Sequence, residues 1–87
     1  MEEASQLDGN AIGGLLIEVF GRELTDAHGC CASCGTISAV GGLIVYRSGP
    51  GDVVRCPSCS AVVIVATPRQ GGPRIFFPGL RWLRPPS

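Results

Sequence analysis

Cys31-Ala-Ser-Cys34 and Cys56-Pro-Ser-Cys59 decide the fold of this chain, because each contributes two cysteines three positions apart. Residues 35–55 separate the two pairs, and this spacing is typical of a four-thiolate metal site. In each pair a tight turn can direct both sulfurs toward one ion, and the backbone N–H groups of the turn can hydrogen-bond to them. The pattern predicts one tetrahedral metal site with the ligands Cys31, Cys34, Cys56 and Cys59.

Zinc is the metal that this ligand set favours, and iron is the alternative, because tetrahedral sulfur sites accept either ion. Four cysteines close the coordination sphere, whereas a catalytic zinc keeps one position open for water or substrate. A structural zinc contributes on the order of 10 kcal/mol to the folding of a small domain, which is comparable with the whole stability of an ordinary domain. We therefore expect the metal to be required for folding.

Two further residues near the first pair have the chemistry of metal ligands. Cys30 is left over once Cys31 takes the Cys-x-x-Cys position, and it is either an exchangeable ligand, a redox thiol or, as we favour, a spare thiol. His28 is an outer-shell partner of the site, a replacement ligand or, more simply, a surface histidine. Four thiolates on a divalent ion carry excess negative charge, so we expect some arginines to hydrogen-bond to sulfur.

Composition places the chain among small globular proteins. Its 87 residues have room for one domain, and domains of this size often need a metal or a partner. The charge is balanced but unevenly spread: six of the seven acids lie in residues 1–26, and six of the seven arginines lie in residues 27–87. The start is acidic and no apolar run reaches the length of a membrane span, so we predict a cytoplasmic protein, where paired cysteines bind metals rather than form disulfides.

The N-terminal part of the chain predicts one short helix. Asp8 or Asn10 can cap it, and Gly21 can end it after Phe20. The helix carries Gly13 and Gly14, which we attribute equally to a close backbone contact or to a frayed first turn. One apolar stripe runs along the helix and consists of Ile12, Leu15, Leu16, Val19 and Phe20.

The rest of the chain predicts short antiparallel strands around the cysteine turns. They are residues 36–40, 43–47, 53–55, 61–66, 74–77 and 80–83. Pro78-Gly79 has the residues of a type II turn. The fold class is therefore a small α+β protein, a zinc ribbon preceded by a short N-terminal helix. We assign residues 1–28 to the helix and linker, 29–83 to the ribbon and 84–87 to a tail, within one structural domain.

The sequence argues against catalysis. With His28 as its single histidine, the chain lacks a Ser/His/Asp set, and it has no glycine-rich phosphate loop between a strand and a helix. Nucleic-acid binding receives some support from arginines interleaved with Phe76, Phe77 and Trp82. The balanced charge and the absence of lysine oppose it, and Phe76 and Trp82 are more simply explained as core residues. The interleaved arginines are Arg69, Arg74, Arg81 and Arg84.

Several motifs together resemble a bacterial family of short proteins of unknown function. They are Leu7-Asp8-Gly9-Asn10-Ala11, Glu18-Val19-Phe20, the first cysteine pair followed by Gly35, Val45-Tyr46, and Arg55 before the second pair. The resemblance covers residues 7–83 and implies a zinc ribbon without an assigned activity. Ser60 follows the second pair where glycine is common. Rubredoxins and nickel-delivering hydrogenase maturation proteins share the cysteine pairs, but the first are usually acidic and richer in core aromatics, and the second need an N-terminal Met-His site.

These observations lead to three functional hypotheses. The first is a non-enzymatic zinc-binding module that docks another protein through the apolar stripe of its N-terminal helix. The second is a rubredoxin-like electron carrier with iron at the same sulfurs, and the third is a nucleic-acid-binding zinc ribbon. We favour the first.

Overall fold

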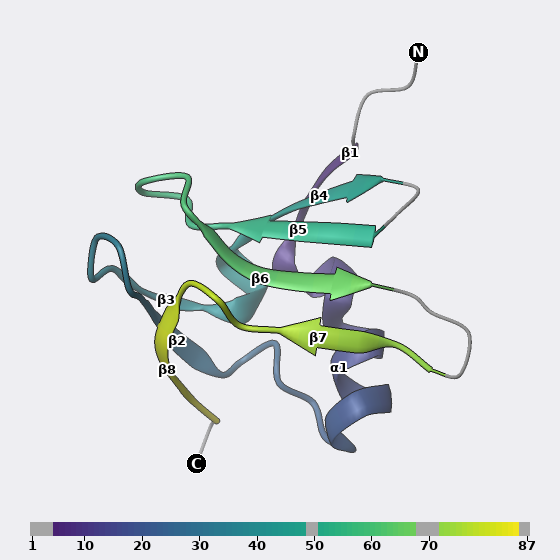
Figure 1. Cartoon of the computed structure of the whole chain (residues 1–87). Coiled ribbons are helices and arrows are strands. Elements are labelled where there is room, and N and C mark those ends of the chain that lie inside the picture. The colour runs from purple at the N-terminus through teal and green to yellow at the C-terminus, as the bar shows by residue number, and fades with distance from the viewer. Residues whose placement is uncertain (1–4, 49–50, 68–71, 86–87) are drawn as a thin grey trace.

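Two antiparallel sheets and one α-helix form the structure, a computed structural model that describes residues 5–48, 51–67 and 72–85 (Figure 1). The larger sheet has the strand order β1 (Ser5–Asp8), β4 (Ile44–Ser48), β5 (Gly51–Arg55), β6 (Val62–Thr67) and β7 (Arg74–Phe76). The smaller sheet has the order β3 (Ile37–Ala39), β2 (His28–Cys31) and β8 (Leu80–Arg84). The predicted small α+β fold is confirmed. Gly49, Pro50 and residues 68–71, which include Arg69, lie outside the described residues.

The N-terminal segment contains a strand that the sequence did not predict. β1 pairs with β4, with Leu7 opposite Val45. Next comes the 3₁₀ turn η1 (Gly9–Ile12), where the side chain of Asp8 accepts a hydrogen bond from the N–H of Asn10 at 3.1 Å. The chain therefore enters its helix from an edge of the larger sheet.

Helix α1 (Gly13–Phe20) follows η1 and ends where the sequence predicts. Gly21 takes a left-handed conformation (φ 74°) and its N–H donates to the carbonyl oxygen of Ile17 at 2.7 Å, which satisfies one of the last carbonyls of the helix. Gly13 is buried, and a Cβ there would lie 3.1 Å from the side chain of Thr25, whereas Gly14 faces open space. A close contact therefore explains the glycine at position 13 but not the glycine at position 14.

The opening motif fits closely against a second 3₁₀ turn, η2 (Val40–Gly42). A Cβ on Gly9 would lie 1.7 Å from the carbonyl oxygen of Val40, so this position accepts no side chain. A Cβ on Gly41 would lie 2.9 Å from Oδ1 of Asn10. The two turns therefore approach each other with backbone in contact, which fixes the start of α1 against the strand connection before β4.

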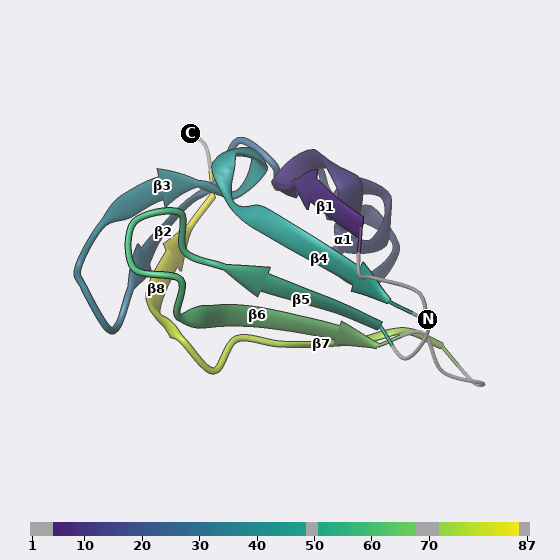
Figure 2. The same cartoon turned by 90° about the horizontal axis from the view of Figure 1, so that it is seen from above.

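The apolar stripe of the helix divides between the core and the surface. Ile12 and Leu16 are buried in the hydrophobic core, while Val19 and Phe20 remain 39% and 44% exposed. Figure 2 shows α1 on one side of the five-stranded sheet, beside β4. Within the described residues, no helix is long and apolar enough to cross a membrane.

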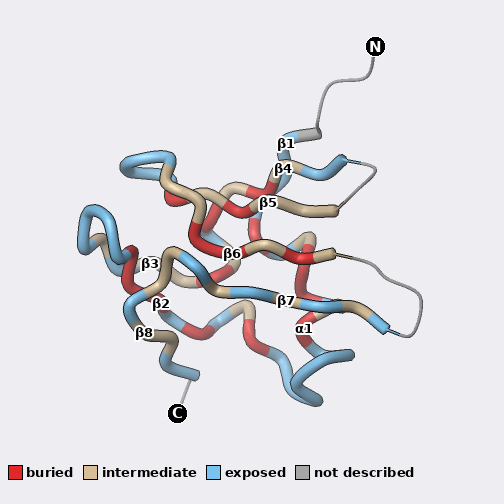
Figure 3. The backbone as a smooth tube through the Cα atoms, in the orientation of Figure 1, coloured by how far each residue is buried: buried red, intermediate tan, exposed pale blue. Residues whose placement is uncertain are grey.

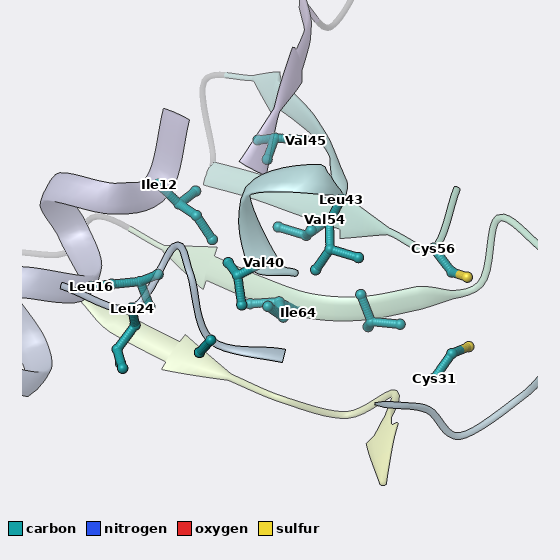
Figure 4. Packing of buried hydrophobic residues seen from close by; sticks show 12 residues of the cluster. Ile12, Leu16, Leu24, Cys31, Val40, Leu43, Val45, Val54, Cys56 and Ile64 are labelled. Carbon is teal, nitrogen blue, oxygen red and sulfur yellow. The ribbon is translucent and has the colours of Figure 1, made fainter. Parts of the chain in front are cut away.

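Branched aliphatic side chains of the central strands fill the core. Val45, Val54 and Ile64 are neighbours in register across β4, β5 and β6, and all three are fully buried (Figure 4). The expectation that Phe76 fills the core is wrong, because this residue lies on the edge strand β7 and is 52% exposed. Trp82 is half-buried and lies outside the core cluster. Small β-branched residues already occupy the space between the sheet and the helix.

The junction between the sheets depends on side chains and on Gly79. Among the described strands, none of one sheet pairs with a strand of the other. The N–H of Gly79 donates to the carbonyl oxygen of Val63 at 3.3 Å, and its own carbonyl accepts from the N–H of Ala32 at 2.8 Å. Gly79 does not have the positive φ of a type II turn, so that prediction is wrong. The glycine is needed because a Cβ would lie 2.0 Å from the carbonyl oxygen of Val62.

Candidate metal centre

The first cysteine turn, which we call knuckle 1 (residues 31–36), connects β2 to β3. The N–H of Gly35 donates to the carbonyl oxygen of Cys31 at 2.8 Å, and the N–H of Cys31 donates to the carbonyl oxygen of Thr36 at 2.9 Å. Gly35 has a left-handed backbone, with φ 79°. These two bonds close the turn and place Cys31 and Cys34 on the same side of it.

Knuckle 2 (residues 56–61) connects β5 to β6 and repeats this geometry. The N–H of Ser60 donates to the carbonyl oxygen of Cys56 at 2.8 Å, and the N–H of Cys56 donates to the carbonyl oxygen of Ala61 at 2.9 Å. Ser60 has φ 66°, a left-handed backbone in the position that Gly35 occupies in knuckle 1. The serine therefore keeps the turn geometry, at the steric cost that a Cβ has in this region.

The strand register shifts by one residue beside each knuckle, as it does at a β-bulge. In the smaller sheet the register between β2 and β8 shifts between Cys30 and Cys31. In the larger sheet the register between β5 and β6 shifts between Val54 and Arg55, immediately before Cys56. Bulges bend a strand and change the direction of the side chains that follow. In each case the extra residue lies on the partner strand, Arg81 in β8 and Val63 in β6, so the irregularity falls on the strand that pairs with the cysteine-bearing one.

The four predicted ligands meet at one point. The Sγ atoms of Cys31, Cys34, Cys56 and Cys59 all lie within 4.8 Å of one another. Two of the distances between the knuckles are 3.6 Å, from Cys31 to Cys59, and 3.7 Å, from Cys34 to Cys56. Sulfurs at the corners of a zinc tetrahedron with Zn–S bonds of about 2.3 Å are about 3.8 Å apart, whereas disulfide sulfurs are bonded at about 2.05 Å. The cluster therefore has the dimensions of a tetrathiolate metal site.

The site has a buried side and an exposed side. Cys31 and Cys56, the first cysteine of each knuckle, are 3% and 1% exposed, and Figure 4 shows their sulfurs directed toward each other at one end of the core. Cys34 and Cys59 are exposed, and Figure 3 shows the tips of both knuckles at the surface. The core thus fixes two of the sulfurs, and the turns hold the other two over them.

Hydrogen bonds favour the thiolate form in knuckle 1. The hydroxyl of Thr36 lies 3.1 Å from the Sγ of Cys34, and together with the Thr36 backbone N–H it lowers the pKa of Cys34 to about 6. Backbone N–H groups of Cys34 and Ser33 likewise lower the pKa of Cys31. A cation that binds here therefore meets a Cys34 sulfur that already tends to lose its proton near neutral pH.

Cys59 has the opposite tendency. The backbone N–H of Ala61 lowers the pKa of Cys59, but partial desolvation and hydrogen bonds with the other three sulfurs together raise it to about 11. A metal ion must therefore displace the proton of Cys59 when it binds. Because metal binding releases protons, metal affinity increases with pH.

No arginine of the described residues hydrogen-bonds to a cysteine sulfur, so the expectation that arginines neutralise the site in this way is not met. Arg55 instead donates to the carbonyl oxygen of Ser60 at 2.7 Å and braces knuckle 2. A backbone group supports the sulfur directly, as predicted: the N–H of Ser58 lies 3.4 Å from the Sγ of Cys56. Backbone support of this kind holds ligands in place without adding charge.

Cys30 and His28 stay outside the cluster, which consists of the four predicted cysteines. Cys30 is buried, with its Sγ 3.6 Å from the carbonyl oxygen of Gly35 and 3.8 Å from that of Cys31. His28 is exposed at the first residue of β2. Cys30 thus packs against the backbone of knuckle 1, and its neighbour Cys31 provides the sulfur of the cluster.

The fold and the cluster define a small α+β domain with a four-cysteine metal-binding site. The chain belongs to DUF6510, a family of unknown function, which matches residues 2–87. This agrees with the predicted membership in a family of short proteins without an assigned function. No curated protein and no solved structure matches the chain.

Replacing Ser60 by glycine is expected to stabilise the metal-bound protein by up to about 1 kcal/mol, because glycine removes the left-handed strain but adds entropy to the unfolded chain. Gly35→Ala in knuckle 1 is the converse variant and is expected to destabilise by about 1–2 kcal/mol. Urea unfolding of both variants with metal present measures the two effects. Equal destabilisation by both substitutions would show that the two knuckles do not share the requirement for a left-handed backbone at this position.

Proposed function

We propose that the four cysteines hold one Zn²⁺ and that this zinc is structural. The observation that carries the proposal is the meeting of four sulfurs, two from each sheet, at the distances of a zinc tetrahedron. Four protein sulfurs leave no open coordination position for water or substrate. The free cysteines fit a reducing compartment such as the cytoplasm.

The function that best fits this site is a non-enzymatic accessory module that docks another protein. The closed ligand set supports a structural metal over a catalytic one. The N-terminal helix supports docking, since its residues Ile17, Val19 and Phe20 are 47%, 39% and 44% exposed. Apolar side chains grouped at the end of one short helix are typical of a protein interface. Ile12 and Leu16 take no part in docking, because the core already buries them.

A rubredoxin-like iron site is the second candidate, and the exposure of Cys34 and Cys59 favours it. Sulfurs that reach the surface give electrons a short route to a partner. The geometry of the sulfurs is equally suited to Fe and Zn. The two functions therefore differ in the metal and not in the fold.

Metal analysis of the protein purified from its native source, without added metal, distinguishes these functions. We expect one zinc per chain and a colourless sample without redox activity. A red sample that contains one iron per chain and can be reduced reversibly would replace the structural role with electron transfer. A protein that contains neither metal and stays folded would contradict both.

A further inference from the structure

An apolar groove of about 480 Å³ lies between the end of α1 and strand β8. Phe20, Leu24, Phe77, Trp82 and Leu83 form most of its walls, and among the described residues that line it Arg22 carries the only charge. A volume of a few hundred Å³ with apolar walls and one or two polar groups is typical of a binding site. The groove is separate from the sulfur cluster and has no part in holding the metal.

The aromatic walls offer contacts that the fold does not use fully. The rings of Phe20 and Phe77 lie with their centroids 6.0 Å apart, which joins the helix to the segment after β7. Phe20 is nevertheless 44% exposed. Large aromatic side chains at the surface contribute strongly to protein interfaces, as do arginines. An apolar side chain inserted here would cover Phe20 and Trp82 together.

The charge next to the groove is positive. The guanidinium of Arg84 lies 4.9 Å from the centre of the Trp82 ring, and Arg22 lines the groove itself. No carboxylate of the described residues lies within 4.0 Å of either arginine. Glu23 is next to Arg22 in sequence, but its carboxylate accepts hydrogen bonds from Thr25. The groove therefore combines an apolar floor with cations that lack a partner in the described part of the chain.

We propose that this groove binds a segment of a partner protein that inserts a leucine or aromatic side chain and directs Asp or Glu toward Arg22 and Arg84. The proposal rests on the docking role described above and specifies the surface and the chemistry of the partner. Acidic residues provide the charge complementarity, and they select partner and orientation more than they add affinity. The apolar anchor provides most of the binding energy.

The metal site holds one wall of the groove in place. β8, which carries Trp82 and Leu83, pairs with β2 so that Leu80 lies opposite Cys31 and Trp82 opposite Cys30. The Gly79 carbonyl before β8 also accepts the N–H of Ala32 in knuckle 1. Loss of the metal frees knuckle 1 and with it the anchor of β8. Binding in the groove is therefore expected to require the metal-bound form.

The test begins with a random peptide library displayed on phage and panned against the full, metal-loaded chain. Peptides with an apolar or aromatic residue flanked by Asp or Glu are expected to be enriched. Their binding can be measured directly, because Trp82 is the only tryptophan of the chain and its fluorescence reports on the groove. Failure to enrich any peptide, or enrichment of peptides without acidic residues, would overturn the proposal.

Two pairs of variants locate the binding of an enriched peptide. Phe20→Ser is expected to weaken binding about tenfold or more, as loss of an interface anchor does. Phe76→Ser is its matched control, since Phe76 is also an exposed phenylalanine but does not line the groove. Circular dichroism and metal content confirm that both variants fold. Equal effects of the two substitutions would contradict docking in the groove.

Charge reversal tests the role of the arginine. Arg22→Glu is expected to weaken the acidic peptide about tenfold and to strengthen its lysine-substituted version. Arg74→Glu is the control, because Arg74 is an exposed arginine that does not line the groove. Sodium dodecanoate is tested beside the peptides. If dodecanoate binds to the groove and no peptide does, the site accepts lipids rather than proteins, and the proposal is wrong.

The same samples separate this proposal from the proposed function. If the protein holds one zinc and no peptide binds, the groove proposal fails and the structural metal remains. If peptides bind in the groove of a protein that contains iron, the docking surface stands and the structural-zinc function fails.

Discussion

Replacing Cys56 by serine is expected to abolish stoichiometric metal binding and to unfold most of the protein at room temperature. Serine nearly preserves the volume of the side chain but does not supply the thiolate that the site needs. Cys56 is 1% exposed and belongs to both the cluster and the hydrophobic core. The metal contributes on the order of 10 kcal/mol in small domains, which is more than a domain of this size can lose.

The position of the cluster explains the size of this effect. Knuckle 1 belongs to the smaller sheet and knuckle 2 to the larger one, and in the described chain no strand pairing joins the two sheets. An ion held by both knuckles therefore connects them directly. Without the ion, the junction depends on packed side chains and on the backbone bonds of Gly79.

Cys30→Ser is the matched control for this substitution. Cys30 is also buried, but its sulfur faces the carbonyl oxygens of Cys31 and Gly35, to which a serine hydroxyl can donate. This variant is expected to retain one metal per chain and a native circular dichroism spectrum. Metal content by mass spectrometry and unfolding by circular dichroism give the comparison. A folded, metal-bound Cys56→Ser protein, or equal metal loss from both variants, would show that the four-sulfur assignment is wrong.

Replacing Gly79 by alanine is expected to destabilise the metal-bound protein by about 3 kcal/mol or more, the upper range for overpacking a close contact. The added Cβ would lie 2.0 Å from the carbonyl oxygen of Val62 and 2.8 Å from the Cα of Val63. Both are backbone atoms, so no side chain can rotate away to relieve the contact. The backbone has to move, and the hydrogen bonds of Gly79 to Val63 and Ala32 are lost with that movement.

Gly14→Ala is the control for Gly79→Ala. Gly14 lies in α1, and a Cβ added to it would have no neighbouring atom within 4 Å, so alanine meets no steric conflict there. Alanine is favoured over glycine in a helix by about 1 kcal/mol, so the free energy of unfolding of this variant should increase by about that amount. Urea unfolding at a fixed zinc concentration measures both. If Gly79→Ala unfolds at the same urea concentration as the original protein, the close contact between the sheets is not as described.

The cysteine cluster and the end of the helix could be predicted from sequence because their signals are local, whereas the predicted cap Asp8 belongs to the 3₁₀ turn η1 and α1 begins only at Gly13. Two Cys-x-x-Cys turns specify their own geometry, and Gly21 ends α1 through its own backbone conformation. Strands β4, β5 and β6 could be predicted because their β-branched residues form continuous runs. Ser60 departs from the usual knuckle sequence, and the structure shows that it adopts the glycine-like conformation all the same.

Other features could not be predicted because they depend on distant parts of the chain. β1 is a strand only because β4 offers an edge for it, and His28-Gly29-Cys30-Cys31 in β2 has no β-branched residue to signal a strand. Phe76 is a large apolar residue of the kind that usually fills a core, but it lies on the edge strand of the larger sheet and is exposed. Pro78-Gly79 has the residues of a type II turn, yet glycine is needed there because the start of β6 lies too close for a side chain. That strand is close in space but distant in sequence.

The unequal burial of the four sulfurs also sets the order in which the ion can be exchanged. Cys31 and Cys56 close the centre from the inside, so an incoming chelator or competing cation approaches through Cys34 and Cys59. Cys34 and Cys59 would be the first ligands that such a competitor reaches, and Cys31 and Cys56 would be the last. A solvent oxidant would likewise reach Cys34 and Cys59 before the buried Cys31 and Cys56.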